Sequence, residues 1–150
     1  MAVAIRVLHR GAETILERIA PGVFDFDPNE RLIKEFLSDA RHHLVVAIEN
    51  DLVVGFVSAV HYVHPDKPTE LWINEVSVAP THQRRGYAKA MLSAMLDVGR
   101  QIGCREAWVL TERPNSPAMA LYSSLGGRES DAVMFTFKLT ENEGIPREET

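Results

Sequence analysis

The stretch Val76-Ser77-Val78-Ala79-Pro80-Thr81-His82-Gln83-Arg84-Arg85-Gly86-Tyr87-Ala88 connects an apolar run to a helical pattern. The apolar run stops at Pro80, and apolar residues return at helical spacing after Gly86. A loop that runs directly into a helix aims backbone N–H groups and the positive end of the helix dipole at one point, which suits a pyrophosphate. The glycine spacing alone fits a plain strand-to-helix turn with solvated arginines equally well.

The composition predicts one domain. With 150 residues and 45% hydrophobic content, the chain is large enough to bury a core without disulfides or a structural metal. We expect a single domain over residues 1–140 and a disordered acidic tail over residues 141–150, which are charged and almost free of apolar side chains. The only cysteine, Cys104, follows a helix with no histidine beside it, so neither an internal disulfide nor a cysteine nucleophile is expected.

Charge and hydropathy restrict the partners of the chain. The early charge at Arg6 argues against a signal peptide, and no apolar run approaches the ~20 residues of a membrane span, so we expect a cytoplasmic protein with no membrane partner. The net charge of −5 argues against a nucleic-acid partner and favours a cationic small molecule or peptide. The six histidines lack metal-ligand spacing, so no metal is expected.

Ahead of the quoted stretch, alternating and β-branched runs predict strands, and apolar residues three or four apart predict helices. The expected strands are 4–8, 43–48, 52–62 and 71–78, and the expected helices are 12–19 and 28–37. Asp27 is the expected N-cap of the second helix, with Pro28 at its first position. The polar turn at 49–51 predicts an antiparallel hairpin.

Beyond the stretch, the pattern predicts a long helix from Gly86 that ends at Gly103, where a left-handed cap is expected. A strand at 107–111 follows, then a helix capped by Ser116 that ends at Gly126, and a last strand at 133–139. Hairpins early in the chain and crossovers late in it imply an α/β fold with a mixed sheet.

Two segments together resemble the motifs of the GNAT superfamily of N-acetyltransferases. Residues 78–88 are similar to its acyl-CoA signature, a Gln/Arg-x-x-Gly-x-Gly/Ala loop after a bulged strand, and residues 115–126 are similar to its Asn-x-x-Ala-x-x-Leu-Tyr-x-x-Leu-Gly motif. The resemblance implies the GNAT fold, a mixed, mostly antiparallel sheet of six to seven strands flanked by about four helices. Gly127 departs from the pattern, since an aromatic or apolar residue is usual there.

The resemblance also implies acetyl-CoA as cosubstrate and direct transfer of its acetyl group to an amine. The backbone of residues 76–78 would pair with the pantetheine arm, and the amides of residues 84–88 would hold the pyrophosphate. Tyr122 matches the tyrosine that protonates the departing thiolate, although a core tyrosine on an apolar helix face is the alternative. The expected cofactor-binding residues are Val76, Val78, Gln83, Arg84, Arg85, Gly86, Tyr87, Ala88 and Asn115.

A neutral amine is needed for attack, so a base is expected near the thioester. Glu75 ranks first, as base or as anchor for the substrate ammonium, because it lies on the strand just before the presumed bulge and alternates with core-facing neighbours. A solvated or salt-bridged strand carboxylate is the alternative reading. Glu112 and His64 are weaker candidates, and Asp25 joins them and Glu75 as an expected substrate-binding residue.

The acceptor is the least determined part of the sequence-based hypothesis. Residues 24–28, 70–78 and 120–129 are similar to aminoglycoside 3-N-acetyltransferases, and the acidic chain suits a polycationic aminoglycoside. That resemblance also implies a homodimer. A peptide N-terminus, a lysine or a small polyamine is the alternative acceptor, and a non-catalytic acyl-CoA-binding sensor is the alternative of another class.

Overall fold

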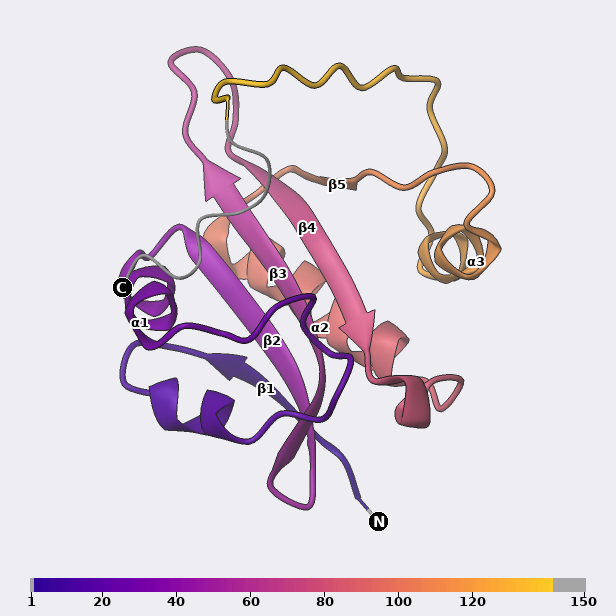
Figure 1. Cartoon of the computed structure of the whole chain (residues 1–150). Helices are drawn as coiled ribbons and strands as arrows, with labels where there is room; N and C mark the ends of the chain where they lie inside the picture. Colours follow the sequence, from indigo (N-terminus) through magenta and orange to yellow (C-terminus); the bar gives the residue numbers. More distant parts are fainter. Residues whose placement is uncertain (1, 142–150) are drawn as a thin grey trace.

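The computed structural model describes residues 2–141 of the chain, and these form one mixed sheet with helical segments around it (Figure 1). The strands follow the spatial order β1-β2-β3-β4-β5, in which the first four pair antiparallel and β5 runs parallel to β4. The strands are β1 (Ala4–Leu8), β2 (His42–Glu49), β3 (Leu52–Tyr62), β4 (Glu70–Val78) and β5 (Glu106–Val109). The predicted α/β class and the mostly antiparallel mixed sheet are therefore confirmed.

Three α-helices and two 3-10 turns accompany the sheet in the described residues. They are η1 (Glu13–Glu17), α1 (Glu30–Ser38), η2 (Pro80–His82), α2 (Tyr87–Ile102) and α3 (Ser116–Ser124). The segment containing η1 and α1 covers one face of the sheet, and α2 lies behind the other face (Figure 1). The core lies between these layers and includes Val45, Phe56, Leu71, Met91 and Met95, all of them buried.

The hairpin between β2 and β3 follows from its turn residues. Asn50 and Asp51 both have positive φ, 53° and 61°, as two-residue hairpin turns of type I′ require. Asn and Asp tolerate this left-handed conformation better than other side chains do. The ladder starts at the pair of Glu49 with Leu52, and an irregularity between Ile48 and Ala47 shifts the register by one residue, which brings Val45 opposite Val57 in the core.

Helix starts differ from the sequence-based expectation by one or two residues. Asn29, not Asp27, caps α1, because its Oδ1 accepts the Leu32 N–H at 3.1 Å while Pro28 stays outside the helix. Asn115, not Ser116, caps α3 by accepting the Ala118 N–H at 3.2 Å. The helix expected at 12–19 is only the 3-10 turn η1.

The end of α3 explains the departure at Gly127. Gly126 adopts φ +88°, and the Gly127 N–H then donates to the Tyr122 carbonyl at 3.0 Å. A Cβ at position 127 would lie 2.8 Å from that carbonyl oxygen, closer than side chains tolerate. A glycine is therefore needed in this tight turn.

The expected number of strands and helices is too high for the described residues. Five strands and three α-helices replace the six to seven strands and about four helices implied by the resemblance. The strand expected at 107–111 ends at Val109, and the strand expected at 133–139 does not form. Its large apolar side chains are 68% to 91% exposed: Val133, Met134, Phe135, Phe137 and Leu139. An alternating segment becomes a strand only where a sheet edge meets it, and this segment pairs with none in the described chain.

The predicted disordered tail lies outside the described residues except for Glu141. None of the helices in residues 2–141 combines the length and the apolar character needed to cross a membrane.

Candidate active site

A β-bulge in β4 determines where Glu75 points. Ser58 of β3 pairs with Glu75 while the next residue, Ala59, pairs with Ile73, so Asn74 is the extra residue. Paired residues share a face of the sheet, and neighbours on one strand alternate between faces. Ile73 therefore faces α2 together with Ala59, whereas Glu75 faces the η1–α1 side together with Ser58. The bulge lies before Glu75, not after it as the sequence reading assumed.

Beyond the bulge, β4 and β5 separate. Their parallel ladder begins at the pair Glu70 and Glu106 and ends at the pair Ile73 and Val109. Residues 75–78 continue to pair with β3 on one side, but on the other side no strand of the described chain pairs with residues 74–78. A run of backbone N–H and C=O groups is thus available to an extended ligand, as at any free strand edge.

The loop after β4 delivers the N-terminus of α2 to the same end of the sheet. Arg84 and Gly86 have positive φ, 64° and 82°, and no side chain of the described residues caps α2 at Gly86. A Cβ placed on Gly86 would meet nothing within 4 Å, so the space above it is open. The glycine is required by its backbone conformation, and the first-turn N–H groups face a site where an anion would be stabilised.

Glu49, at the end of β2, anchors this loop. Its carboxylate lies 2.6 Å from His82 Nε2 and accepts the Tyr87 hydroxyl at 3.1 Å. Desolvation works against ionisation of Glu49, but the hydrogen bonds from His82 and Tyr87 outweigh it and lower the pKa of the carboxyl. Arg85 Nη1 lies 3.8 Å from the same carboxylate.

Several side chains expected to bind the cofactor are therefore used inside the protein. The Tyr87 hydroxyl is bonded to Glu49, and the Gln83 amide donates to the Val78 carbonyl at 3.1 Å. Arg85 also donates to the Thr81 carbonyl at 3.3 Å. These bonds fix the loop, which leaves its backbone N–H groups as the main contribution to anion binding.

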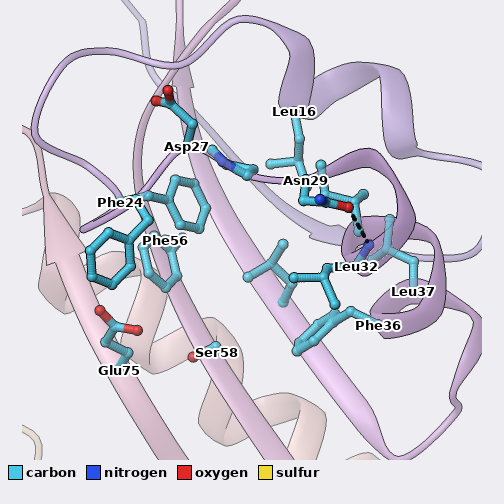
Figure 2. A pocket seen from close by; sticks show the side chains of 14 residues that line it. Leu16, Phe24, Asp27, Asn29, Leu32, Phe36, Leu37, Phe56, Ser58 and Glu75 are labelled. Atoms are coloured by element: carbon cyan, nitrogen blue, oxygen red, sulfur yellow. Dashed lines mark hydrogen bonds between the residues drawn. The ribbon is translucent and has the colours of Figure 1, made fainter. Parts of the chain in front are cut away.

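A cavity of ≈ 300 Å³ lies between the η1–α1 layer and strands β2 to β4. Glu75 and Ser58 line one end of it, where the rings of Phe24 and Phe56 stack with centroids 4.3 Å apart. Figure 2 shows the Glu75 carboxylate beside these two rings, with aliphatic side chains of α1 toward the other end. The volume is at the lower end of the range for small-molecule sites.

Glu75 has the properties of a general base. Burial of part of its surface, followed by the negative charge of Asp25, raises the pKa of the Glu75 carboxyl. Solvent still reaches the side chain because the pocket is open. No hydrogen bond or ion pair holds the carboxylate within the described residues, so it is available to a ligand.

Tyr122 lies on α3, half-buried against the core together with Leu121 and Leu125. Burial raises the pKa of its hydroxyl, which keeps the group protonated at neutral pH. Its hydroxyl makes no hydrogen bond within residues 2–141. The Asn115 side chain, an expected cofactor ligand, is occupied as the cap of α3.

Of the other expected substrate residues, the structure brings Asp25 near Glu75, whereas His64 and Glu112 lie outside the pocket. Asp25 is close enough to Glu75 to raise its pKa. His64 Nδ1 instead lies 2.6 Å from an Asp66 carboxylate oxygen in the exposed β3–β4 loop, and Glu112 is exposed beyond the end of β5. Neither lines the pocket. No group of three or more His, Cys, Asp or Glu in the described chain is arranged to hold a metal ion.

The sequence did not predict the stacked rings of Phe24 and Phe56 at the pocket or the contact by which Glu49 holds the loop before α2. Phe24 and Phe56 meet across the fold from distant segments, and only the alternation of Phe24 and Phe26 with aspartates gave a sign of a special surface. Glu49 was read only as part of a polar turn. Nothing in its neighbourhood along the chain indicates that it meets His82, 33 residues away.

Strand β4 is bulged and then separates from its parallel neighbour β5, and a loop that ends at Gly86 leads into the N-terminus of α2. Together these features define an α/β domain suited to a nucleotide thioester. The chain belongs to the Acetyltransferase (GNAT) family, whose model matches residues 10–126.

Curated relatives are acetyltransferases with different named acceptors. Human N-acetyltransferase 8 is 30% identical over 105 residues, 69% of this chain and 46% of that protein. Aminoglycoside N(6')-acetyltransferase type 1 of Salmonella typhimurium is 28% identical over 60% of this chain and 65% of its own length. L-2,4-diaminobutyric acid acetyltransferase of Marinococcus halophilus is 31% identical over 65% of this chain and 56% of its own. This chain thus spans about half to two thirds of these relatives.

Solved structures share the fold. An aminoglycoside acetyltransferase from an uncultured soil metagenomic sample superposes with a TM-score of 0.77 at 24% identity, covering 93% of this chain and 100% of that one. Aminoglycoside N-acetyltransferase AAC(6')-Iy in complex with CoA gives a TM-score of 0.72 at 24% identity, covering 93% and 96%. The aminoglycoside enzymes among these proteins that carry a position in their names are 6'-acetyltransferases, so the similarity is not specific to the 3-N group.

Proposed function

We propose that this chain is an N-acetyltransferase that moves the acetyl group of acetyl-CoA directly to the primary amine of a small molecule. The observation that carries the proposal is the Glu75 carboxylate. This carboxylate lines the pocket, forms no hydrogen bond or ion pair within the described residues and has a raised pKa. It lies on β4, whose edge is free at residues 74–78. A carboxylate placed in this way accepts a proton from an amine as it attacks.

The residues present fit acetyl-CoA. The free edge of residues 74–78 suits an extended amide-containing arm, and the uncapped start of α2 with open space above Gly86 suits a pyrophosphate. Bound there, acetyl-CoA would supply an activated acetyl group with a thiolate as leaving group. The family relatives named above and the CoA complex of AAC(6')-Iy support this cosubstrate.

Each residue then has a defined task. Glu75 takes the proton that the amine loses as its nitrogen forms the new bond to the acetyl carbon. Backbone N–H groups of residues 76–78 stabilise the negative charge on the carbonyl oxygen, and each such donor is worth roughly 2.7–4 kcal/mol in other acyl-transfer enzymes. Tyr122, whose hydroxyl is neutral at pH 7 as in any tyrosine and whose pKa burial raises further, gives a proton to the sulfur when the C–S bond breaks.

The names of relatives support an aminoglycoside as one acceptor, but they point to the 6' amine as readily as to the 3-N position. A peptide N-terminus, a lysine or a small polyamine remains the alternative. A non-catalytic acyl-CoA sensor is the alternative of another class, and it would need neither Glu75 nor Tyr122.

The test is thiol release from acetyl-CoA with a panel of aminoglycosides, simple amines, amino acids and peptides. Release that depends on an added amine supports the transferase. Tight binding of CoA with no release for any amine would instead identify a sensor.

We also propose that the protein is a homodimer joined through residues 133–139. The outer edge of β5 has no strand beside it in the described chain, and this alternating, exposed segment is not part of the sheet. A second copy would satisfy both needs reciprocally. Two phenylalanines alone carry roughly 300–500 Å² of surface, a large part of the ≈ 800 Å² that each partner buries in a stable interface.

Light scattering after size exclusion tests this pairing. Twice the chain mass of 16.8 kDa is expected, and Phe137→Ser should reduce it to one chain mass. Phe26→Ser, which alters an exposed phenylalanine outside the segment, should leave the dimer intact. A wild-type monomer at tens of micromolar would refute the proposal.

A further inference from the structure

The wall of the cavity beside Glu75 is mostly apolar. Its polar lining residues are Asp27, Asn29, Ser58 and Glu75, and all others are aliphatic, aromatic or proline. The Asn29 amide oxygen already caps α1. Few polar groups are therefore left in the wall to satisfy the hydroxyls and ammonium groups of a polar acceptor.

The polar groups lie at two places on the cavity wall, Glu75 and Ser58 on the sheet and Asp27 and Asn29 just before α1 (Figure 2). Glu75 and Ser58 stand at one end beside the Phe24 and Phe56 rings, and the side chains of Leu32 and Phe36 lie toward the other (Figure 2). A buried hydroxyl or ammonium that loses water without gaining a partner costs about 1–3 kcal/mol or more. Burial of a carbon chain against the same wall is favourable.

Large apolar side chains at the pocket remain partly open to solvent. Phe26 is 43% exposed and Leu32 is 41% exposed, although both line the cavity. Exposed apolar surface that borders a concave site is typical of ligand-binding grooves. An acceptor with an apolar body would cover this surface.

We infer that the acceptor is a primary monoamine with an apolar alkyl or arylalkyl body, whose ammonium end meets Glu75 and whose carbon body lies along the α1 wall. This inference rests on the proposed function and narrows it. It argues against polycationic, polyhydroxylated aminoglycosides as the preferred acceptor, because the cavity wall offers too few polar groups to bind their hydroxyl and ammonium groups.

A homologous series of acceptors tests the inference. Thiol release is measured with n-alkylamines from ethylamine to octylamine, with 2-phenylethylamine, and with kanamycin. The kcat/KM should rise about fourfold for each added methylene until the cavity is full. 1,6-Diaminohexane should be at least tenfold poorer than hexylamine, because its second ammonium would enter the apolar end.

A pair of variants tests whether the apolar side chains of α1 cause the expected preference for longer alkylamines. Leu32→Gln should lower kcat/KM for hexylamine about tenfold and leave ethylamine unchanged. Ile102→Gln is the matched control, since Ile102 is a similarly exposed helix residue (38%) that does not line the cavity. It should change neither substrate.

The outcomes separate this inference from the proposed function. A kcat/KM that is flat or falls with chain length, or that is highest for kanamycin, overturns the apolar acceptor while the transferase stands. Calorimetry of hexylamine with the unliganded protein gives a readout without turnover, and a negative heat-capacity change is expected. Binding with that signature but no thiol release for any amine would refute the transferase and keep the apolar pocket. No binding and no turnover would refute both.

Discussion

Glu75→Gln should move catalysis and stability in opposite directions. The substitution keeps the size of the side chain but removes the proton acceptor, and general bases contribute typically 10²–10⁴-fold. Burial and the charge of Asp25 raise the pKa of Glu75, so the folded state disfavours its ionised form. A carboxyl whose pKa is raised on folding lowers stability as pH increases from its unfolded pKa to its folded pKa. At pH 7 the glutamine should therefore not destabilise the protein.

The expected size of each effect follows from the site. Turnover should fall at least 100-fold. The free energy of unfolding should stay within about 0.5 kcal/mol of wild type, on the stabilising side, because Glu75 makes no bond that the substitution would break. For a chain of this length that corresponds to a rise in Tm of at most about 2 °C.

The pH profile gives the sharper measurement. An alkylamine substrate titrates near pH 10, so below neutrality it contributes a slope of one to the plot of log kcat/KM against pH. Ionisation of Glu75 adds a second unit of slope below its pKa. The wild type should show a slope of two at acid pH, and Glu75→Gln a slope of one throughout. Asp25→Asn should move the break to lower pH, because it removes the like charge that raises the pKa.

Glu70→Gln is the matched control. Glu70 lies on the same strand, but it accepts hydrogen bonds from Tyr62 at 2.7 Å and from Trp108 at 3.1 Å and does not line the pocket. Its replacement should leave the slope of two and the turnover unchanged. A slope of two that survives in Glu75→Gln, or a loss of turnover explained by a lower Tm, would refute the assignment of Glu75 as base.

Four further predictions concern other parts of the molecule. Tyr122→Phe should lower kcat at least tenfold with an unchanged Tm, measured by thiol release and calorimetry, and a fully active variant would reject its role as acid. Gly86→Ala should cost about 1 kcal/mol in denaturant unfolding because of its positive φ, and should weaken acetyl-CoA binding in calorimetry. Glu49→Gln should raise the Kd of acetyl-CoA several-fold while hardly changing the KM of the amine, since its carboxylate holds only the loop. Burial and the neighbouring His61 lower the pKa of His43 to about 4, so stability should fall as pH drops from 6.5 to 4, and His43→Leu should flatten that dependence in thermal melts.

The parts of the site that depend on local chemistry could be predicted from the sequence. Gly86 and Gly103 do bound the long helix, each with positive φ, and the loop before it takes the form expected of an anion-binding turn. Hairpin and helix patterns set the α/β class because each depends on residues a few positions apart. Strict alternation would have placed Glu75 on the same face as Ile73, so its position in the cavity depends on the bulge at Asn74, which the sequence pattern placed on the wrong side of Glu75.

The remaining parts depend on contacts between distant segments. The stack of Phe24 on Phe56 and the bond from Glu49 to His82 join residues about thirty positions apart, and no local pattern carries that information. The segment 133–139 was wrongly predicted as a strand. Its apolar and polar side chains do alternate, but a strand also needs a neighbouring sheet edge, which the local pattern does not reveal. The helix caps were missed because Asp27 and Asn29 are chemically equivalent caps, and only the backbone decides between them.

Asn74 is a residue of β4 whose removal would leave the pairing partners of its two neighbours unchanged. Substitution of Asn74 preserves the count of residues and hence the side to which Glu75 points. Deletion of Asn74 would restore regular alternation, with Ile73 still opposite Ala59 and Glu75 still opposite Ser58, so the carboxylate would keep facing the cleft. In a deletion scan of β4, loss of Asn74 should therefore be far less damaging than loss of Glu75 itself, and nearly any side chain at position 74 should be tolerated.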